Sequence, residues 1–243
     1  MNVLSIDVGG TNVKILLSGE KEPRKMPSGP EFTPAMMVTD VRKLAAEWKF
    51  DVVSIGFPAP VQNNKPVAEP YNLGGGWVGF DYEKSFGCPV KMINDAAMQA
   101  MGSYNGGKML FLGLGTGLGS AIVADGVLLP LELGHLPYRK KTFEDYVGIK
   151  GLKKNGTSKW QKHVFDAVKI LTAAILPDYL VLGGGNVKKL KELPPACVEG
   201  NNSNAFLGGF RMWEGPADRK KEHAQRAPRA SRVIQRKKVS RIG

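Results

Sequence analysis

Short apolar runs that end at glycine or at a polar residue recur along the chain. A mostly apolar run at residues 3–7 ends at Asp7, a Gly-Gly-Thr turn follows, and residues 13–17 resume the apolar pattern. Apolar runs of about four to eight residues bounded by turn residues are typical of β-strands. The same sequence of run, glycine turn and returning run recurs at residues 109–124. The pattern predicts two β-hairpins, each with a glycine-rich turn.

Further strands and helices are predicted around these hairpins. The strands are expected at residues 51–56, 89–93 and 179–182, and the helices at residues 35–48, 95–101, 160–176 and 186–190. Strands that alternate with segments of helical spacing predict an α/β protein. Because each half of the chain carries a glycine-rich hairpin, we interpret the halves as duplicated lobes that face one cleft.

The composition is that of an ordinary globular protein. Of the 243 residues, 42% are hydrophobic and 23% are charged, so the chain is expected to bury a core. The first residues do not resemble a secretory signal, and no run approaches the roughly 18 apolar residues of a membrane span. We therefore expect a cytoplasmic protein. Cys88 and Cys197 lack CxxC spacing, so neither a disulfide framework nor a cysteine zinc site is predicted.

The positive charge is concentrated at the end of the chain. The net charge is +12, and residues 216–243 hold ten Lys or Arg against two Asp or Glu, which leaves +4 for residues 1–215. A mildly basic folded part does not predict a specific nucleic-acid partner. The polar tail, residues 216–243, is expected to be mostly disordered. It could bind polyanions or acidic membranes non-specifically.

The two glycine turns predict phosphate binding. Glycine allows tight turns and lets backbone N–H groups approach a polyanion, and threonine adds a hydroxyl donor. Either turn alone could be an ordinary hairpin turn, but two of them could hold one phosphate chain from both sides. The candidate residues are Gly9, Gly10, Thr11 and Lys14 in the first turn and Gly115, Thr116 and Gly117 in the second.

Two aspartates stand at the ends of predicted strands. Asp7 precedes the first glycine turn, and a carboxylate there could hold Mg²⁺ through water. Asp95 follows a strand and begins a helix, where the helix dipole favours a negative charge. The alternative for Asp95 is a helix N-cap without a chemical role.

Five short motifs occur in a fixed order, and together they resemble the ROK family of sugar kinases. They are DVGGTNVK at residue 7, INDA at 93, GLGTGLG at 113, ELGH at 132 and LGGG at 182. The stretches at 141–148 and 204–214 resemble the polyphosphate glucokinase branch in particular. The resemblance implies an actin-like (ribonuclease H-like) duplicated two-lobe α/β fold with a central cleft. We expect a small lobe at 1–93 and a large lobe at 94–215, whose last segment packs back on the small lobe.

The resemblance also implies a role for each motif. Asp95 is then the general base that accepts the proton of a hexose hydroxyl, and Asp7 holds Mg²⁺. Glycines 183–185 form the turn nearest the adenosine of ATP. The implied sugar contacts are Asn72, Asn94, Asp95, Glu132, His135 and Glu144, and the implied donor contacts at the last turn are Gly183, Gly184 and Gly185. By composition alone, Asn72 would be a turn residue and Glu144 a solvated charge.

The sequence departs from the wider family after the ELGH motif. Many relatives continue with a cysteine cluster that binds structural zinc, whereas this chain continues with HLPYRKKTFEDY. His135 is therefore assigned to the sugar and no zinc site is expected. Ala59 stands where a second glycine is usual, which affects only the local loop.

The phosphoryl donor and the exact acceptor stay open at this point. Residues 139–162 carry eight Lys or Arg against two Asp or Glu, a stretch that could follow polyphosphate or could be a solvated helix face. The LGGG turn leaves ATP possible. We expect glucose or mannose as the hexose and a homodimer as the assembly. A sugar-sensing regulator of the same fold is the alternative, although DVGGT begins at residue 7 and leaves no room before it for a DNA-binding motif. A filament-forming actin relative would leave the sugar-site residues without a purpose.

Overall fold

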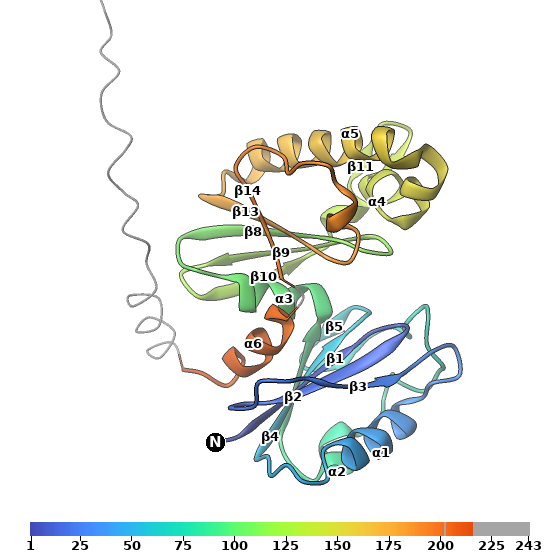
Figure 1. The fold of residues 1–243 in the computed structure, drawn as a ribbon, viewed down its shortest axis with the longest axis vertical. Coiled ribbons are helices and arrows are strands. Elements are labelled where there is room, and N and C mark those ends of the chain that lie inside the picture. Colours follow the sequence, from blue (N-terminus) through green and yellow to red (C-terminus); the bar gives the residue numbers. More distant parts are fainter. Residues whose placement is uncertain (202, 216–243) are drawn as a thin grey trace, which may run out of the picture.

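The chain forms two five-stranded β-sheets, one from each half of the sequence. The computed structural model describes residues 1–201 and 203–215, and the predicted disordered tail lies outside these residues. Figure 1 shows the two sheets one above the other. In order across the first sheet stand β3 (Arg24–Pro27), β2 (Asn12–Leu17), β1 (Val3–Val8), β4 (Val52–Phe57) and β7 (Val90–Asn94); across the second stand β10 (Val127–Leu131), β9 (Leu118–Ala124), β8 (Lys108–Leu114), β13 (Tyr179–Gly183) and β14 (Cys197–Glu199).

The two sheets have the same topology. In each, three antiparallel strands form a meander, and two later strands extend the sheet in parallel from the first of these strands. The innermost strands are buried on both faces, as β4 is throughout its length, which explains their continuous apolar sequence. The duplication predicted from the repeated glycine hairpins is confirmed.

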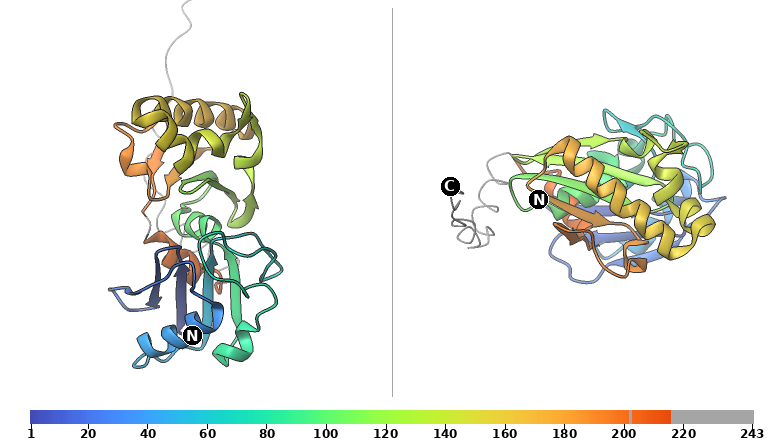
Figure 2. Two further views of the ribbon diagram at one scale, coloured as in Figure 1. Left: turned by 90° about the vertical axis from the view of Figure 1, so that its right-hand side faces the viewer. Right: turned by 90° about the horizontal axis from the view of Figure 1, so that it is seen from above.

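Helices cover the outer face of each sheet. Figure 2 shows the long helix α5 crossing the outer side of the second sheet. The first sheet buries a core against α1, whose Met37 and Val41 are completely buried, and the second buries Trp160 of α5. The outer helices are α1 (Pro34–Leu44) and α2 (Tyr82–Phe86) on the first sheet, and α4 (Phe143–Val147) and α5 (Ile149–Ile175) on the second.

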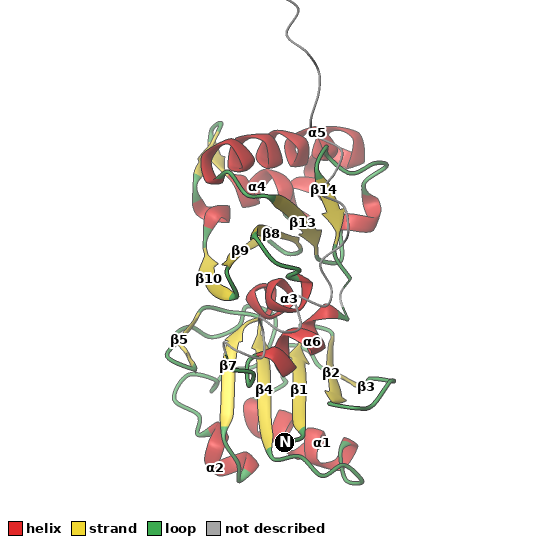
Figure 3. Cartoon of the chain, turned by 90° about the vertical axis from the view of Figure 1, so that its left-hand side faces the viewer, coloured by secondary structure: helices red, strands yellow, loops and turns green. Residues whose placement is uncertain are grey.

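Two helices, α3 (Asp95–Ser103) and α6 (Asn204–Arg211), lie between the sheets (Figure 3). Helix α3 packs on the inner face of the second sheet and α6 packs on β1 and β4. They approach so closely that a Cβ atom added to Gly102 would lie 1.8 Å from the carbonyl oxygen of Asn204. The last segment of the described chain therefore returns to the first sheet.

The remaining elements are short. Two small hairpins and two 3₁₀ turns lie in the connections between the main elements. They are β5 (Val61–Gln62) with β6 (Lys65–Pro66), β11 (Pro137–Tyr138) with β12 (Lys141–Thr142), η1 (Leu133–His135) and η2 (Val187–Lys189).

Three predicted helices differ from the observed ones. The helix expected at 35–48 ends at Leu44. The helix expected at 160–176 already begins at Ile149, and Gly156 inside it has φ 69° and ψ 164°, which kinks it. Glycine is the residue that tolerates this conformation. The helix expected at 186–190 is only the 3₁₀ turn η2.

Candidate active site

One cavity of about 580 Å³ lies between the two halves of the molecule. It brings together residues from distant parts of the chain, including most of those predicted from the motifs. The predicted residues that line it are Gly9, Gly10, Asn72, Asn94, Asp95, Gly115, Thr116, Gly117, Glu132, His135, Glu144, Gly184 and Gly185. Asp7, Thr11, Lys14 and Gly183 do not line it.

Asp95 begins α3 at the floor of this cavity. The preceding residue, Asn94, is the N-cap, and its Oδ1 accepts hydrogen bonds from the N–H groups of Ala96 at 3.0 Å and Ala97 at 3.3 Å. Oδ1 of Asp95 itself accepts from Ala96 N–H at 2.8 Å. Because Asn94 caps the helix, the capping role does not require Asp95, which leaves its carboxyl for the cavity.

The surroundings of Asp95 hold its proton. Burial, followed by the charges of Asp7 and then Glu132, raises the pKa of Asp95 to about 7. The N–H of Ala96 opposes this by stabilising the carboxylate. A carboxyl whose pKa lies near neutrality can accept and release a proton under physiological conditions.

Asp7 lies at the end of β1, behind the first glycine turn. Its register partner on β2 is Lys14, whose Nζ lies 4.0 Å from Oδ2 of Asp7. Burial raises the pKa of Asp7, and the positive charge of Lys14 partly offsets this. Two carboxyl groups, of Asp7 and Asp95, thus interact across the edge of the cavity.

The first glycine turn is held tightly in place. The N–H of Gly9 donates to Asn12 O at 3.1 Å, and the hydroxyl of Ser28 donates to Gly9 O at 2.6 Å. A Cβ atom on Gly10 would come within 2.9 Å of Cβ of Asn72. The glycine here therefore lets the turn and the loop that carries Asn72 meet. Thr11 is exposed outside the cavity.

The second and third glycine turns are joined. The side-chain Nδ2 of Asn186, which follows the turn at 183–185, donates to Gly115 O in the turn at 115–117 at 3.0 Å. Gly184 has φ +87°, and a Cβ there would lie 2.5 Å from the backbone of Leu114. Gly183 is buried against Phe111 instead of facing the cavity. The predicted residues Gly115, Thr116 and Gly117 therefore form one continuous wall with Gly184 and Gly185.

The other predicted sugar residues stand on the same side of the cavity. Nε2 of His135 lies 3.8 Å from Oε1 of Glu144. Ser120 supports the turn that carries Glu132, because its hydroxyl donates to Leu131 O at 2.8 Å and accepts from Leu133 N–H at 3.0 Å. Polar oxygen and nitrogen atoms of these side chains can pair with the hydroxyls of a sugar.

Three of the unpredicted residues that line the cavity, Glu69, Tyr71 and Gln99, have polar side chains. Oε2 and Oε1 of Glu69 accept from the N–H groups of Trp77 and Val78, both at 3.1 Å, which holds the loop that carries Asn72. Tyr71 is 88% exposed beside it. Gln99 lies one helical turn after Asp95, a spacing that places both on one face of α3. That spacing was the only available signal.

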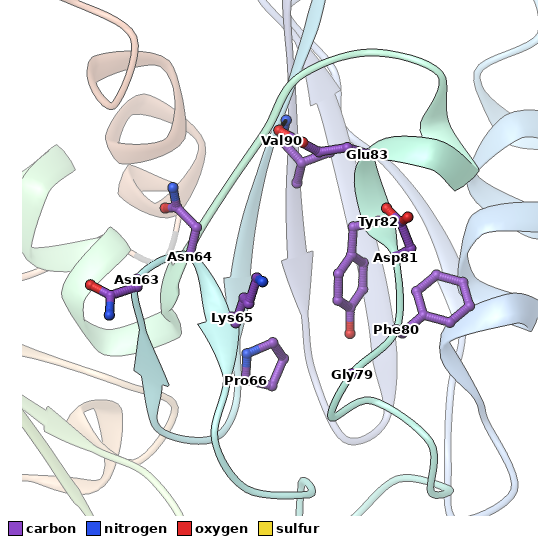
Figure 4. A pocket seen from close by; sticks show the side chains of 10 residues that line it. All are labelled: Asn63, Asn64, Lys65, Pro66, Gly79, Phe80, Asp81, Tyr82, Glu83 and Val90. Atoms are coloured by element: carbon purple, nitrogen blue, oxygen red, sulfur yellow. Dashed lines mark hydrogen bonds between the residues drawn. The ribbon is translucent and has the colours of Figure 1, made fainter.

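Two further cavities lie apart from Asp95. One of about 430 Å³ shares Gly184 and Gly185 with the first and adds Val187, Lys188, Glu199, Gly200 and Asn201. Another, of about 470 Å³, lies between the β5–β6 hairpin and α2 (Figure 4). None of the predicted site residues lines the cavity in Figure 4.

Comparison with known proteins decides the family. The model of the ROK family matches residues 3–144 of this chain. The chain belongs to the ROK family. This membership, predicted from the order of the motifs, is confirmed.

Relatives and solved structures of the ROK family agree with this placement. A polyphosphate glucokinase of Mycobacterium tuberculosis is 30% identical over 139 residues, which cover 51% of this chain and 52% of that protein. The chain thus spans about half the length of the curated relatives it matches. The inorganic polyphosphate/ATP-glucomannokinase of Arthrobacter sp. strain KM has a TM-score of 0.72 at 24% identity, covering 90% of this chain and 99% of the other. A ROK family glucokinase from Streptomyces griseus, in complex with glucose and AMPPNP, has a TM-score of 0.70 at 15% identity, covering 87% and 99%.

These structural matches confirm the predicted actin-like fold of this ROK protein. Among the described residues, no helix is both long enough and apolar enough to cross a membrane. No group of three or more metal-binding side chains occurs within residues 1–201 and 203–215 either.

Proposed function

We propose that this ROK protein is a hexose kinase that transfers a phosphoryl group to the sugar 6-hydroxyl. The observation that carries the proposal is the position of Asp95, which lines the same cavity as the glycine turns at 9–10, 115–117 and 184–185. A carboxyl group and phosphate-binding turns in one cavity are the parts that phosphoryl transfer to an alcohol needs. The relatives named as glucokinases support the choice of glucose, with mannose as the next candidate.

Asp95 is proposed as the general base. As the hydroxyl oxygen forms its bond to phosphorus, the Asp95 carboxylate accepts the hydroxyl proton and the bond to the donor's leaving oxygen breaks. The products are a sugar phosphate and a donor shortened by one phosphoryl group. Charge stays spread over the phosphate oxygens in this reaction, so positioning by the glycine turns contributes most of the catalysis.

The sugar is proposed to bind between Asn72, Asn94, Glu132, His135 and Glu144. A buried sugar hydroxyl without a partner would cost about 1 to 3 kcal/mol, so several fixed partners are needed. The side chains of Glu132 and His135 come from one turn, η1, and Glu144 from α4. These elements are joined by the segment discussed in the next subsection.

Magnesium is expected with the donor. The carboxyl of Asp7 is the proposed holder of a Mg²⁺ ion through water: it does not itself line the cavity, but its charge acts on Asp95, which does, and hard cations prefer oxygen ligands. When bound, the ion would offset the negative charge of the phosphates. Lys14, 4.0 Å from Asp7, holds that carboxyl in place.

The donor is proposed to be polyphosphate, with ATP as a competing donor. The neighbouring cavity that begins at Gly184 and Gly185 extends the site away from Asp95. Its described lining contains one cation, Lys188, and one carboxyl, Glu199, and no aromatic side chain on which an adenine could stack. Seven exposed lysines occur on the β11–β12 hairpin and α5, at 140, 141, 150, 153, 154, 159 and 162. Cationic side chains and an absent stacking surface favour a long polyanion over a nucleotide.

The test is an assay of glucose and mannose phosphorylation with ATP or polyphosphate at increasing salt. Polyphosphate use should fall steeply with salt because counterions compete for the lysines. Asp95→Asn should lower kcat by about 10² to 10⁴-fold with each active donor, while the circular dichroism spectrum and Tm are retained. Asp125→Asn, the same change at an exposed turn residue outside the three cavities, is the control for the Asp95 change. No turnover with any hexose and donor, or full turnover by Asp95→Asn, would refute the proposal.

A further inference from the structure

The segment between His135 and Glu144 is a closed hairpin. Strands β11 and β12 pair Pro137 with Thr142 and Tyr138 with Lys141, and the N–H of Phe143 donates to Leu136 O at 3.1 Å. One end of this segment carries His135 and the other carries Glu144, and both side chains line the cavity. A shift of the hairpin would therefore move both residues.

The hydroxyl of Tyr138 ties this hairpin to α5. It donates to Oδ2 of Asp166 at 2.8 Å and accepts from Nε of Arg139 at 3.0 Å. Nδ1 of His163 lies 3.1 Å from the same oxygen. A phenol has one proton and two lone pairs; because the proton goes to Asp166, Nδ1 of His163 must donate. All three hydrogen-bonding positions of the oxygen are then occupied.

Aromatic packing and charge complete the cluster. The Tyr138 ring stacks on Phe143 with centroids 4.8 Å apart. The rings of Tyr146 and His163 stand nearly perpendicular to it, with centroids at 5.2 and 5.8 Å. Arg139 also donates from Nη2 to Asp166 at 3.2 Å. Burial, reinforced by the charge of Arg139 and opposed by that of Asp166, lowers the pKa of His163 and so favours its neutral ring. The cluster spans the hairpin, α4 and α5.

We propose that Tyr138 is a positioning residue whose hydroxyl, held by Asp166 and His163, fixes the hairpin and thereby the places of His135 and Glu144. This inference rests on the proposed function for its sugar-binding consequence. Tyr138 is only three residues from His135, and its partners His163 and Asp166 lie on α5, outside the hairpin. Their hydrogen bonds therefore fix the hairpin against a separate element. Neither His135 nor Glu144 has a hydrogen bond of its own side chain to another element in the described residues, apart from their mutual contact at 3.8 Å.

The first experiment removes only the Tyr138 hydroxyl, with Tyr138→Phe. Calorimetric Kd for glucose and its KM should each rise about 5- to 30-fold, the effect of one lost buried hydrogen-bond set. The KM for the donor should stay unchanged, and kcat should fall less than twofold. A merely structural role would lower Tm without this difference between the two substrates. The control is Tyr146→Phe, which removes a hydroxyl from the same aromatic group with no hydrogen bond found in the described residues.

A second pair of variants tests the partner on α5. Asp166→Asn keeps an oxygen that accepts from Tyr138 and should bind glucose like the parent, whereas Asp166→Ala should match Tyr138→Phe. This pair also carries the test if Tyr138→Phe does not fold. Glucose affinity unchanged in both Tyr138→Phe and Asp166→Ala would overturn the proposal.

The failure of the proposed function can be told apart from the failure of this inference. If the parent protein binds no hexose, the proposed function is wrong, and amide hydrogen exchange over residues 133–148 then decides the inference. Faster exchange in Tyr138→Phe and Asp166→Ala, but not in Tyr146→Phe, supports a hairpin fixed by the hydroxyl. Exchange equal to that of the parent in all three variants contradicts it.

Discussion

At the scale of single residues, the raised pKa of Asp95 and its proposed role as a base place opposite requirements on the carboxyl group. Its surroundings keep the proton on the carboxyl, whereas a general base must be free of it. In the unfolded chain an aspartate has a pKa near 3.8, but in the folded protein burial and Asp7 raise the pKa of Asp95 to about 7. Ionised Asp95 therefore destabilises the fold: its contribution is most favourable below about pH 4 and is lost as the pH rises to about 7. The proposed role of Asp95 as a base therefore opposes stability at this position.

The same value sets the pH dependence of the proposed reaction. Because the free enzyme must have Asp95 ionised to accept the hydroxyl proton, kcat/KM for glucose should rise about tenfold per pH unit below 7 and level off above it. Initial rates between pH 5 and 9 measure this. Glu132→Gln removes one of the charges that raise the pKa and should move the midpoint to lower pH. A midpoint near pH 4, or one that Glu132→Gln moves upward, would contradict the assignment.

The sequence predicted the identity of these residues better than their roles. Strand ends followed by a helix place Asn94 and Asp95 at the cavity, and the motif order adds Glu132, His135 and Glu144. The sequence did not show which of Asn94 and Asp95 caps the helix, because both residue types are good N-caps. Only the backbone geometry shows that Asn94 is the cap. Gln99 was missed since a glutamine within a helix carries no distinguishing local pattern.

At the scale of elements, the crossing of α3 and α6 holds the two halves together. Arg211 at the end of α6 is 2% exposed and donates from Nη1 to the carbonyl oxygens of Met101, Gly102 and Tyr104 at the end of α3. The helix itself leaves its last carbonyls, including those of Met101 and Gly102, without partners. A cation there also offsets the negative end of the α3 dipole. The same helix begins at Asp95, so the crossing bears on the site.

This close approach predicts a large effect of one methyl group. In Gly208→Ala the added Cβ would stand 1.8 Å from Met98 O. Helix propensity favours alanine over glycine by about 1 kcal/mol. A net loss of stability in Gly208→Ala must therefore come from the clash between α3 and α6. We expect the free energy of unfolding to fall by about 2 to 4 kcal/mol, as measured by urea unfolding. Gly29→Ala, where the new methyl meets nothing within 4 Å, is the matched control. Equal stability of both variants would show that the helices separate freely.

Strands were easier to predict than helices in this chain. Each hairpin is local, so its alternation of apolar run and glycine turn is visible in sequence. The start of α5 is not visible in the sequence, because Gly156 and the lysines around it interrupt the apolar pattern of the first helical turns. The anchoring of α6 depends on contacts with residues more than 100 positions away, such as Trp213 Nε1 donating to Ser54 Oγ at 2.9 Å. Only the motif resemblance indicated it.

At the scale of the whole molecule, the proposed lobes at 1–93 and 94–215 meet around one open cavity. Its walls come from both sides: Gly10 and Asn72 belong to the first part, and Gly117 and Glu132 to the second. Two chain passages join the parts, at the start of α3 and before α6. Such an arrangement lets a ligand that contacts both walls favour a closed form. These contacts lie within one chain and do not define a surface for a second copy, so the homodimer stays a prediction.

Closure is therefore expected when glucose binds. Contacts to Asn72 on one wall and Glu132 on the other exist together only if the walls approach, so binding energy shifts the equilibrium toward the closed form and excludes water from the transfer. The radius of gyration from small-angle X-ray scattering should fall by on the order of 1 Å on adding glucose. L-glucose should leave it unchanged. Asp95→Asn should still close, because it loses the base and keeps both walls, whereas Asn72→Ala combined with Glu132→Ala should not. A radius that stays constant with saturating glucose would mean that the site works in its open form, with Asp95 reached by solvent throughout.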